Sequence, residues 1–227
     1  MSLSLTSALR VGTALAALAL AHPASADVLL QTATLDPGAI AAANSLVLQG
    51  DGTTAGDGFS GGSHFIGADF TVAGPTQLTD IGASFVNTAQ QAATGPIFGA
   101  IVEVDPVTGL PTQDVENLAS ITLAEAVFTP DADGDTTVPL SASLQPGTYG
   151  LVFGSGLFGA TGVADLLSGN DIVGSPSIFE NDFAPFAQDP SDIDVRLFAD
   201  GTVPEPGSLP LLLSASLLLA SLARRRS

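Results

Sequence analysis

The stretch IGADFTV, residues 66–72, places four apolar side chains at every second position: Ile66, Ala68, Phe70 and Val72. An aspartate and a threonine stand between them. Successive side chains of a β-strand point to opposite faces, so a period of two indicates a strand with one buried face and one solvated face. The stretch therefore predicts a strand on the surface of an apolar core.

The same alternation recurs along the chain, at residues 81–85, 138–144, 149–153 and 193–197. Residues 97–104 are nearly apolar on both faces and predict a central strand. Pro139 has no N–H for a ladder, so its strand is expected at the edge of a sheet. About eight to ten strands at this spacing predict an all-β fold, an antiparallel β-sandwich that is jelly-roll-like.

Turn and helix signals lie between these runs. Turns are predicted at residues 105–109, at Asp133-Gly134 and at Pro146-Gly147. Residues 118–128 allow strand or helix, and their Ile-Thr-Leu centre favours a strand. Short helices are predicted at residues 39–44 and at residues 162–168, the second with Thr161 as its N-cap and Gly169 as its stop.

The N-terminus has the layout of a secretory signal peptide. Residues 1–10 carry one basic side chain, Arg10, and residues 11–21 form a largely apolar core. Ala24-Ser25-Ala26 then offers small residues at a cleavage site. The sequence predicts a signal peptide at residues 1–26, passage through the export translocon, and an exported domain at residues 27–202.

The last 25 residues, 203–227, have three parts in a fixed order. Val203-Pro204-Glu205-Pro206 is held extended by its prolines, residues 209–223 form an apolar run, and Arg224, Arg225 and Arg226 follow it. The run is shorter than the ~20 residues of a typical membrane-spanning helix. Basic residues mark the cytoplasmic flank of such a helix. The tail is either an ordinary membrane anchor or a sorting signal, and the order of its parts favours the sorting signal.

This tail resembles the PEP-CTERM sorting signal of Gram-negative exported proteins, over residues 203–227 only. The resemblance implies that Val203, Pro204, Glu205 and Pro206 are the recognition motif for a membrane-embedded exosortase. It further implies transient anchoring in the inner membrane by the C-terminal transmembrane helix, with the domain in the periplasm. Proteins with this signal are associated with exopolysaccharide and biofilm matrix, so a cell-surface or extracellular location is expected.

The exported part is strongly acidic. All 23 acidic residues lie from Asp27 to Glu205, and Arg196 is the one basic residue between Asp27 and Val203. Such a domain repels phosphate backbones, which excludes nucleic acid as an expected partner. Its acidity favours divalent cations or basic partners, although solubility alone also explains an acidic surface.

Asp131, Asp133 and Asp135 are the best candidate metal ligands. They alternate across a Gly-containing turn, and carboxylate oxygens are the ligands that calcium prefers. The EF-hand pattern fails because Thr136 and Ala142 occupy positions that require Gly and Glu. A solvated acidic turn is the simpler interpretation, so no cofactor is expected other than calcium at this turn.

The sequence offers no convincing catalytic residue. Residues 58–62 match the Gly-x-Ser-x-Gly spacing around Ser60, but the strand-to-helix context of a nucleophile elbow is missing. His64 is the one histidine after the signal peptide, and Ser155 lacks the spacing. Residues 174–190 hold Phe179, Phe183 and Phe186, which either pack in the core or rim a binding site, and core packing is favoured.

These observations predict an exported, non-enzymatic protein with a structural, adhesive or glycan-binding role. The alternative is a secreted hydrolase that acts on matrix polysaccharide through some of its many carboxylates, whose spatial separation the sequence does not give.

Overall fold

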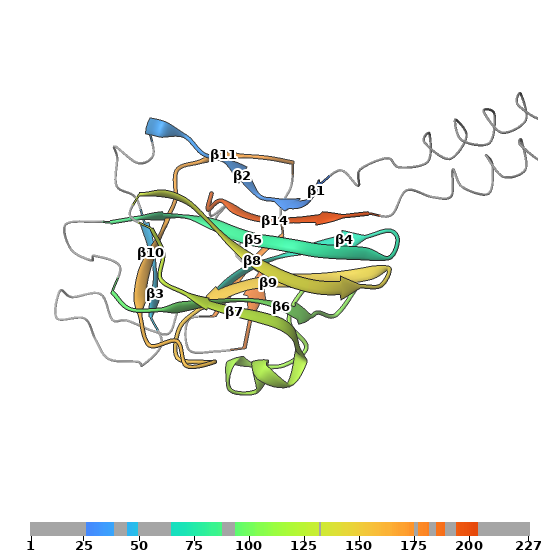
Figure 1. Cartoon of the computed structure of the whole chain (residues 1–227). Helices are drawn as coiled ribbons and strands as arrows, with labels where there is room; N and C mark the ends of the chain where they lie inside the picture. The colour runs from blue at the N-terminus through green and yellow to red at the C-terminus, as the bar shows by residue number, and fades with distance from the viewer. Residues whose placement is uncertain are drawn as a thin grey trace, which may run out of the picture. The chain divides into compact units, whose positions relative to one another are not determined.

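Two antiparallel sheets face each other across a shared apolar core (Figure 1). The computed structural model describes residues 26–38, 45–49, 65–87, 94–131, 133–174, 177–181, 185–188 and 194–203. Within them, residues Ala26–Thr202 belong to one compact unit. The predicted all-β, sandwich-like fold is confirmed.

The first sheet has the strand order β1 (Asp27–Gln31), β14 (Leu197–Thr202), β5 (Thr76–Val86), β10 (Val163–Leu167) and β3 (Ser45–Gln49), and β8 (Gly134–Leu144) also pairs with β5. The second has the order β13 (Ala187–Gln188), β12 (Ile178–Asn181), β4 (Phe65–Val72), β9 (Gly147–Gly154), β6 (Ile97–Glu103) and β7 (Thr122–Phe128). A small ribbon pairs β2 (Ala33–Thr34) with β11 (Asp171–Ile172). The domain also contains a 3₁₀ helix, η1 (Val115–Ile121).

The alternating strands bury the faces that their sequences predict. The apolar set of residues 66–72 lies in the core between the sheets, together with Ile81 and Phe85 of β5 and Phe153 of β9. Strand β8 alternates between buried or half-buried and exposed residues along its whole length. The period of two in the sequence is therefore the period of burial.

A second apolar cluster covers the outer face of the second sheet. Phe65, Phe98 and Phe179 point away from the main core, and Leu118 and Ile121 of η1 pack in the same cluster. Strand β6 is consequently buried on both faces from Ile97 to Val102 and lies between β7 and β9. The prediction of a central strand at residues 97–104 is confirmed.

Edge and turn predictions also agree with the structure. Strand β8 pairs with β5 alone among the described strands, and Pro139 lies opposite Asp80 beside a register shift.

In the turn after β6, the Asp105 carboxylate accepts the N–H groups of Val107 and Thr108, at 2.8 and 3.0 Å. Both bonds lower the pKa of Asp105, and the bond from Thr108 has the larger effect.

Two sequence predictions need correction. Residues 162–168 are not a helix: residues Val163–Leu167 form strand β10, which lies between β5 and β3. Pairing with these two strands decided the conformation of this short apolar segment. The last predicted strand, at residues 193–197, begins only at Leu197, where β14 starts, and continues to Thr202.

For residues 118–128, where strand was favoured over helix, the strand is confirmed from Thr122 onward as β7, and the residues before it form the end of η1. The helix predicted at residues 39–44 lies outside the described residues.

Candidate functional site

Nine residues on the outer face of the first sheet form three rows across β8, β5 and β14, and we call them the β8–β5–β14 face. Each row takes one residue from β8, one from β5 and one from β14 or, for Arg196, from the position just before β14. The rows are Asp135, Ser84 and Arg196; Thr137, Gly82 and Phe198; Pro139, Asp80 and Asp200. Leu197 and Ala199 of β14 point into the core, so alternation turns Phe198 and Asp200 outward. The face brings together the domain's lone guanidinium, an aromatic ring and three carboxylates.

Arg196 is held from three sides. Its Nε donates to both carboxylate oxygens of Asp135, at 3.0 and 3.1 Å, and its Nη1 donates to the carbonyl oxygen of Ala33 at 2.5 Å. Its guanidinium carbon lies 4.9 Å from the ring centroid of Phe198. The Ser84 hydroxyl donates to the same Asp135 carboxylate. Arg196 therefore ties the N-terminal segment, β5 and β8 to the start of β14.

Phe198 lies directly over Gly82, where a Cβ atom would collide with its ring. Only 7% of Phe198 is exposed. The ring is therefore packed between Gly82 and Arg196 and offers no open stacking surface to solvent.

Asp80 and Asp200 face each other directly across β5 and β14. Burial raises the pKa of Asp200, the negative charge of Asp80 raises it further, and Arg196 opposes both effects. A carboxyl group that retains its proton more readily, beside a second carboxylate, is suited to exchanging protons or hydrogen bonds with hydroxyl groups. Sequence analysis did not single out this pair, because strand register alone creates it.

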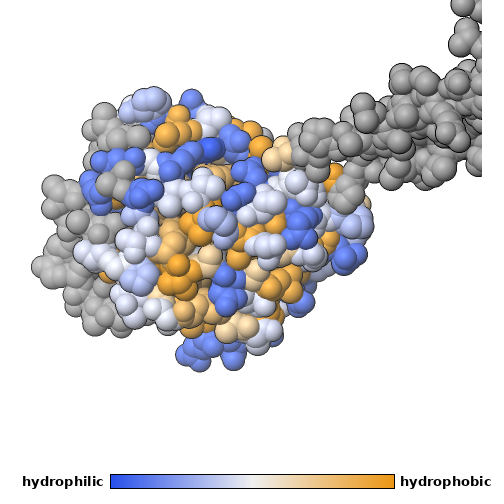
Figure 2. All heavy atoms as spheres, viewed as in Figure 1, coloured by the Kyte–Doolittle hydropathy of each residue, from blue (hydrophilic) through white to orange (hydrophobic). Residues whose placement is uncertain are grey.

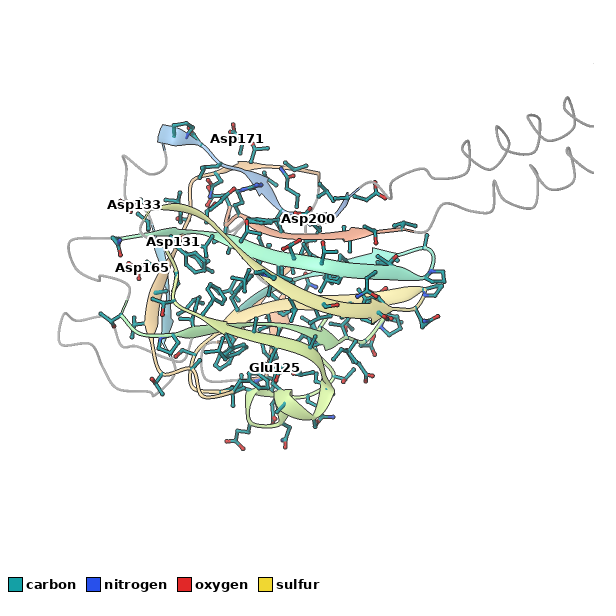
Figure 3. All side chains as sticks on the ribbon, viewed as in Figure 1. Glu125, Asp131, Asp133, Asp165, Asp171 and Asp200 are labelled. Carbon is teal, nitrogen blue, oxygen red and sulfur yellow. The ribbon has the colours of Figure 1, made fainter. Side chains whose placement is uncertain are left out.

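The predicted metal turn does not converge on one point. The Asp133 carboxylate accepts the N–H of Asn87 at 2.8 Å, and Asp135 is bound by Arg196. Figure 3 shows Asp131 and Asp133 near one end of the sandwich, away from Asp200. The described residues contain no group of three or more carboxylate or imidazole side chains placed to hold a metal ion. The calcium prediction gains no support from this geometry.

The turn has a backbone explanation instead. Asp133 and Gly134 both have positive φ, at 50° and 121°. Aspartate and glycine tolerate this region better than other residues, which explains why an Asp-Gly pair precedes β8.

Two other sequence candidates have structural roles. Phe179 and Phe186 are buried and meet edge to face, with ring centroids 5.6 Å apart, so the core interpretation is confirmed for these two rings. Ser155 is fully buried and its hydroxyl donates to the carbonyl oxygen of Gly162 at 2.6 Å. Neither feature offers a reactive group to a substrate.

The remaining candidates lie outside the described residues. They are Ala24 and the rest of the predicted signal peptide before Ala26, Ser60, His64 and Phe183, and the tail from Pro204, Glu205 and Pro206 to Arg224, Arg225 and Arg226. Val203 is described and directly follows β14. Among the helices that the structure describes, none has the length and hydropathy to cross a membrane.

Comparison with known proteins gives a weak structural likeness. The chain matches no protein-family model, and no curated protein is significantly similar to it. One similar solved structure comprises the cysteine protease and lectin-like domains of Cwp84, a surface layer associated protein of Clostridium difficile. The identity is 12%, the TM-score is 0.44, and the match covers 70% of this chain and 36% of that chain. The chain thus spans about a third of that structure's length, and at this level the likeness carries no functional argument.

Proposed function

We propose that this chain is an exported, non-enzymatic protein of the cell surface or extracellular matrix, with a structural or adhesive role. One observation carries the proposal beyond the two targeting patterns in the sequence. The first and last strands of the sandwich, β1 and β14, pair antiparallel with Asp27 opposite Gly201. Both targeting segments are therefore joined to the sandwich at neighbouring points on one edge.

This arrangement suits a domain that is tethered and later released. Cleavage after Ala26 leaves the sandwich in the periplasm, held to the inner membrane through the segment after Val203. The Val203–Pro206 motif is then the recognition element for an exosortase-type enzyme. Because Asp27 and Gly201 are paired, the two processing events cut the chain at neighbouring points of the same domain.

The β8–β5–β14 face is the part of the domain that we assign to glycan contact. Its carboxylates accept hydrogen bonds from sugar hydroxyls, while the stem of Arg196 supplies apolar surface. The jelly-roll-like topology that the sequence predicts belongs to this proposal. Short connections support it, since β4 to β5 and β8 to β9 each pass from one sheet to the other.

The test of location is the intact mass of the chain recovered from cell envelopes and from culture medium. We expect two trimmed ends, with the N-terminus at Asp27 and the C-terminus near Val203–Pro206. Changing Glu205 to Ala is expected to leave the tail uncut and the protein in the envelope. A full-length polypeptide in the cytosol would refute the proposal.

The alternative, a secreted hydrolase acting on matrix polysaccharide, is favoured by one observation, the pair Asp80 and Asp200 with the raised pKa of Asp200. The two functions predict different results when the purified protein is incubated with exopolysaccharide. A structural role predicts co-sedimentation without release of reducing ends. Release of reducing ends that is lost in Asp200→Asn would replace the proposal with the hydrolase.

A further inference from the structure

Strand β7 is the terminal strand of the second sheet and leaves one side of its backbone without a strand partner. It pairs with β6, and no other described strand pairs with it. The ladder with β6 is regular from Ala124 to Phe128, after a register shift at Leu123. Along the free side, every second residue directs its N–H and C=O groups outward, which is a template for another strand.

Two of the usual protections of an edge strand, proline and short length, are missing from β7. Strand β8, the neighbouring edge of the first sheet, carries Pro139, and β13 has only two residues. Strand β7 reads TLAEAVF, without proline, and Glu125 is its one charged residue. Its register shift lies near one end and leaves a regular ladder from Ala124 to Phe128, so this part of the edge is open to strand addition.

The exposed side chains of β7 alternate apolar, acidic and apolar. Leu123 and Val127 are 46% and 42% exposed, and Glu125 stands between them. Figure 2 shows apolar residues gathered along the course of β7 and between β7 and β8. Figure 3 shows Glu125 on the same strand. An incoming strand that matches this pattern has apolar side chains beside Leu123 and Val127 and a basic side chain opposite Glu125.

A second copy of this chain does not match it. Antiparallel pairing of β7 with itself, with Leu123 opposite Val127, places Glu125 against Glu125, and like charges directly opposite are destabilising. The exported segment also carries 22 acidic residues against Arg196 alone, so two copies repel each other. Charge complementarity therefore selects a different protein as the partner.

We propose that the free side of β7 binds an extended segment of another protein by strand addition. The segment is apolar at alternate positions and carries lysine or arginine opposite Glu125. Main-chain hydrogen bonds supply affinity, and the Glu125 contact supplies register and selectivity. This inference does not depend on the proposed function.

The test uses the full chain in a mild non-ionic detergent and three synthetic peptides of alternating valine and threonine, with lysine, glutamate or proline at the centre. We expect the lysine peptide to bind about fivefold more tightly than the glutamate peptide at low ionic strength. The proline peptide is expected to bind most weakly, because proline disfavours a position within a hydrogen-bonded strand ladder. Hydrogen exchange is expected to slow in β7 when the lysine peptide is bound.

Three variants decide between binding at β7 and binding elsewhere. Glu125→Lys is expected to reverse the preference between the lysine and glutamate peptides. Val127→Lys is expected to weaken all binding, whereas Ser141→Lys, at an exposed position on edge strand β8 outside the β8–β5–β14 face, is expected to leave it unchanged. These side chains are exposed, so folding is expected to survive each change.

Several results would overturn the proposal. Failure of the lysine peptide to bind, equal binding by the wild type and Glu125→Lys, or slowed exchange at a strand other than β7 each contradict it. A concentration-dependent dimer that is lost in Val127→Lys would make a second copy the occupant and refute the basic partner.

Discussion

At the residue scale, Arg196 and Asp200 show how one strand, β14, and its approach set the electrostatics of a whole face. Arg196 is bound by Asp135, by the carbonyl oxygen of Ala33 and by the ring of Phe198. Asp200 lies four residues later on the same face, opposite Asp80. Arg196 donates hydrogen bonds to the acceptors around it, whereas Asp200 lies where burial and Asp80 disfavour its negative charge.

Replacing Arg196 with methionine is expected to lower the free energy of unfolding by about 2 kcal/mol. The change leaves the Asp135 carboxylate and the Ala33 carbonyl oxygen without this donor, while it keeps most of the apolar stem over Phe198. Urea unfolding of the full chain measures the effect. Arg196→Lys is the matched control and should retain part of the stability, because it keeps the charge but not the planar fork. Equal stability of Arg196→Met and the wild type would show that the network contributes nothing.

Asp200→Asn is expected to stabilise the fold by about 0.5 kcal/mol at pH 7. The pKa of Asp200 in the folded state is raised, mainly by burial and then by Asp80. The folded state therefore holds this proton more tightly than the unfolded chain does, and this contribution to stability falls as pH rises through the raised pKa. As pH rises, the ionised carboxylate in the folded state bears the cost of burial and the repulsion of Asp80, and asparagine removes this charge.

Urea unfolding at pH 7 and at a pH below both pKa values tests this sign. The gain is expected to vanish at the lower pH, where wild-type Asp200 is protonated in both states. Asp171→Asn changes the net charge equally at an exposed position in β11 and is expected to have little effect. A gain of the same size in Asp171→Asn would attribute the effect to net charge instead of the Asp80–Asp200 contact.

At the element scale, β10 shows how strand partners override a local preference. The segment VADLL is compatible with a helical turn, yet it pairs with β3 along its length and with the end of β5. Its entry is fixed by Gly162, whose N–H donates to the carbonyl oxygen of Pro96 and whose carbonyl oxygen accepts from Ser155. Close backbone packing before the strand, more than the strand residues themselves, sets its path.

Gly162→Ala is expected to destabilise the protein by about 1–3 kcal/mol. A Cβ atom at this position would lie 2.6 Å from the carbonyl oxygens of Gly95 and Pro96, and backbone atoms cannot rotate away. Gly74→Ala, in the connection between β4 and β5, is the matched control, since nothing lies within 4 Å of its added Cβ. Thermal unfolding should lower the Tm of the first variant and leave the second nearly unchanged. A similar Tm for both would contradict the close packing of Gly162.

At the scale of the whole molecule, negative charge is the dominant property of the exported domain. The formal charge of the full chain is −18, and four of its five basic residues lie outside residues 27–203. The acids are spread over both sheets and their connections, so they repel one another across the surface. Folding therefore brings many negative charges close together, and Arg196 is the one positively charged side chain among residues 27–203.

Raising sodium chloride from 0.01 to 0.15 M is expected to raise the Tm by about 3 °C, because it shortens the screening length from about 30 to about 8 Å. Calcium at equal ionic strength tests the predicted metal turn separately. The partners of Asp133 and Asp135 lead us to expect no additional rise. An additional rise with calcium that is lost in Asp131→Asn or Asp133→Asn would establish the calcium site.

The sequence by itself determined where most strands run, which faces they bury, and how acidic the exported part is. Alternation with a period of two is a property of the local chain, so residues 66–72 and 138–144 were readable without any partner. Short segments such as residues 162–168 were not, because their conformation depends on which strands lie beside them. Only the tertiary structure decided that Asp27 meets Gly201, that Asp80 meets Asp200, and that β7 lies at an open edge. Register joins residues more than a hundred positions apart through packing and hydrogen bonds, and no local pattern contains that information.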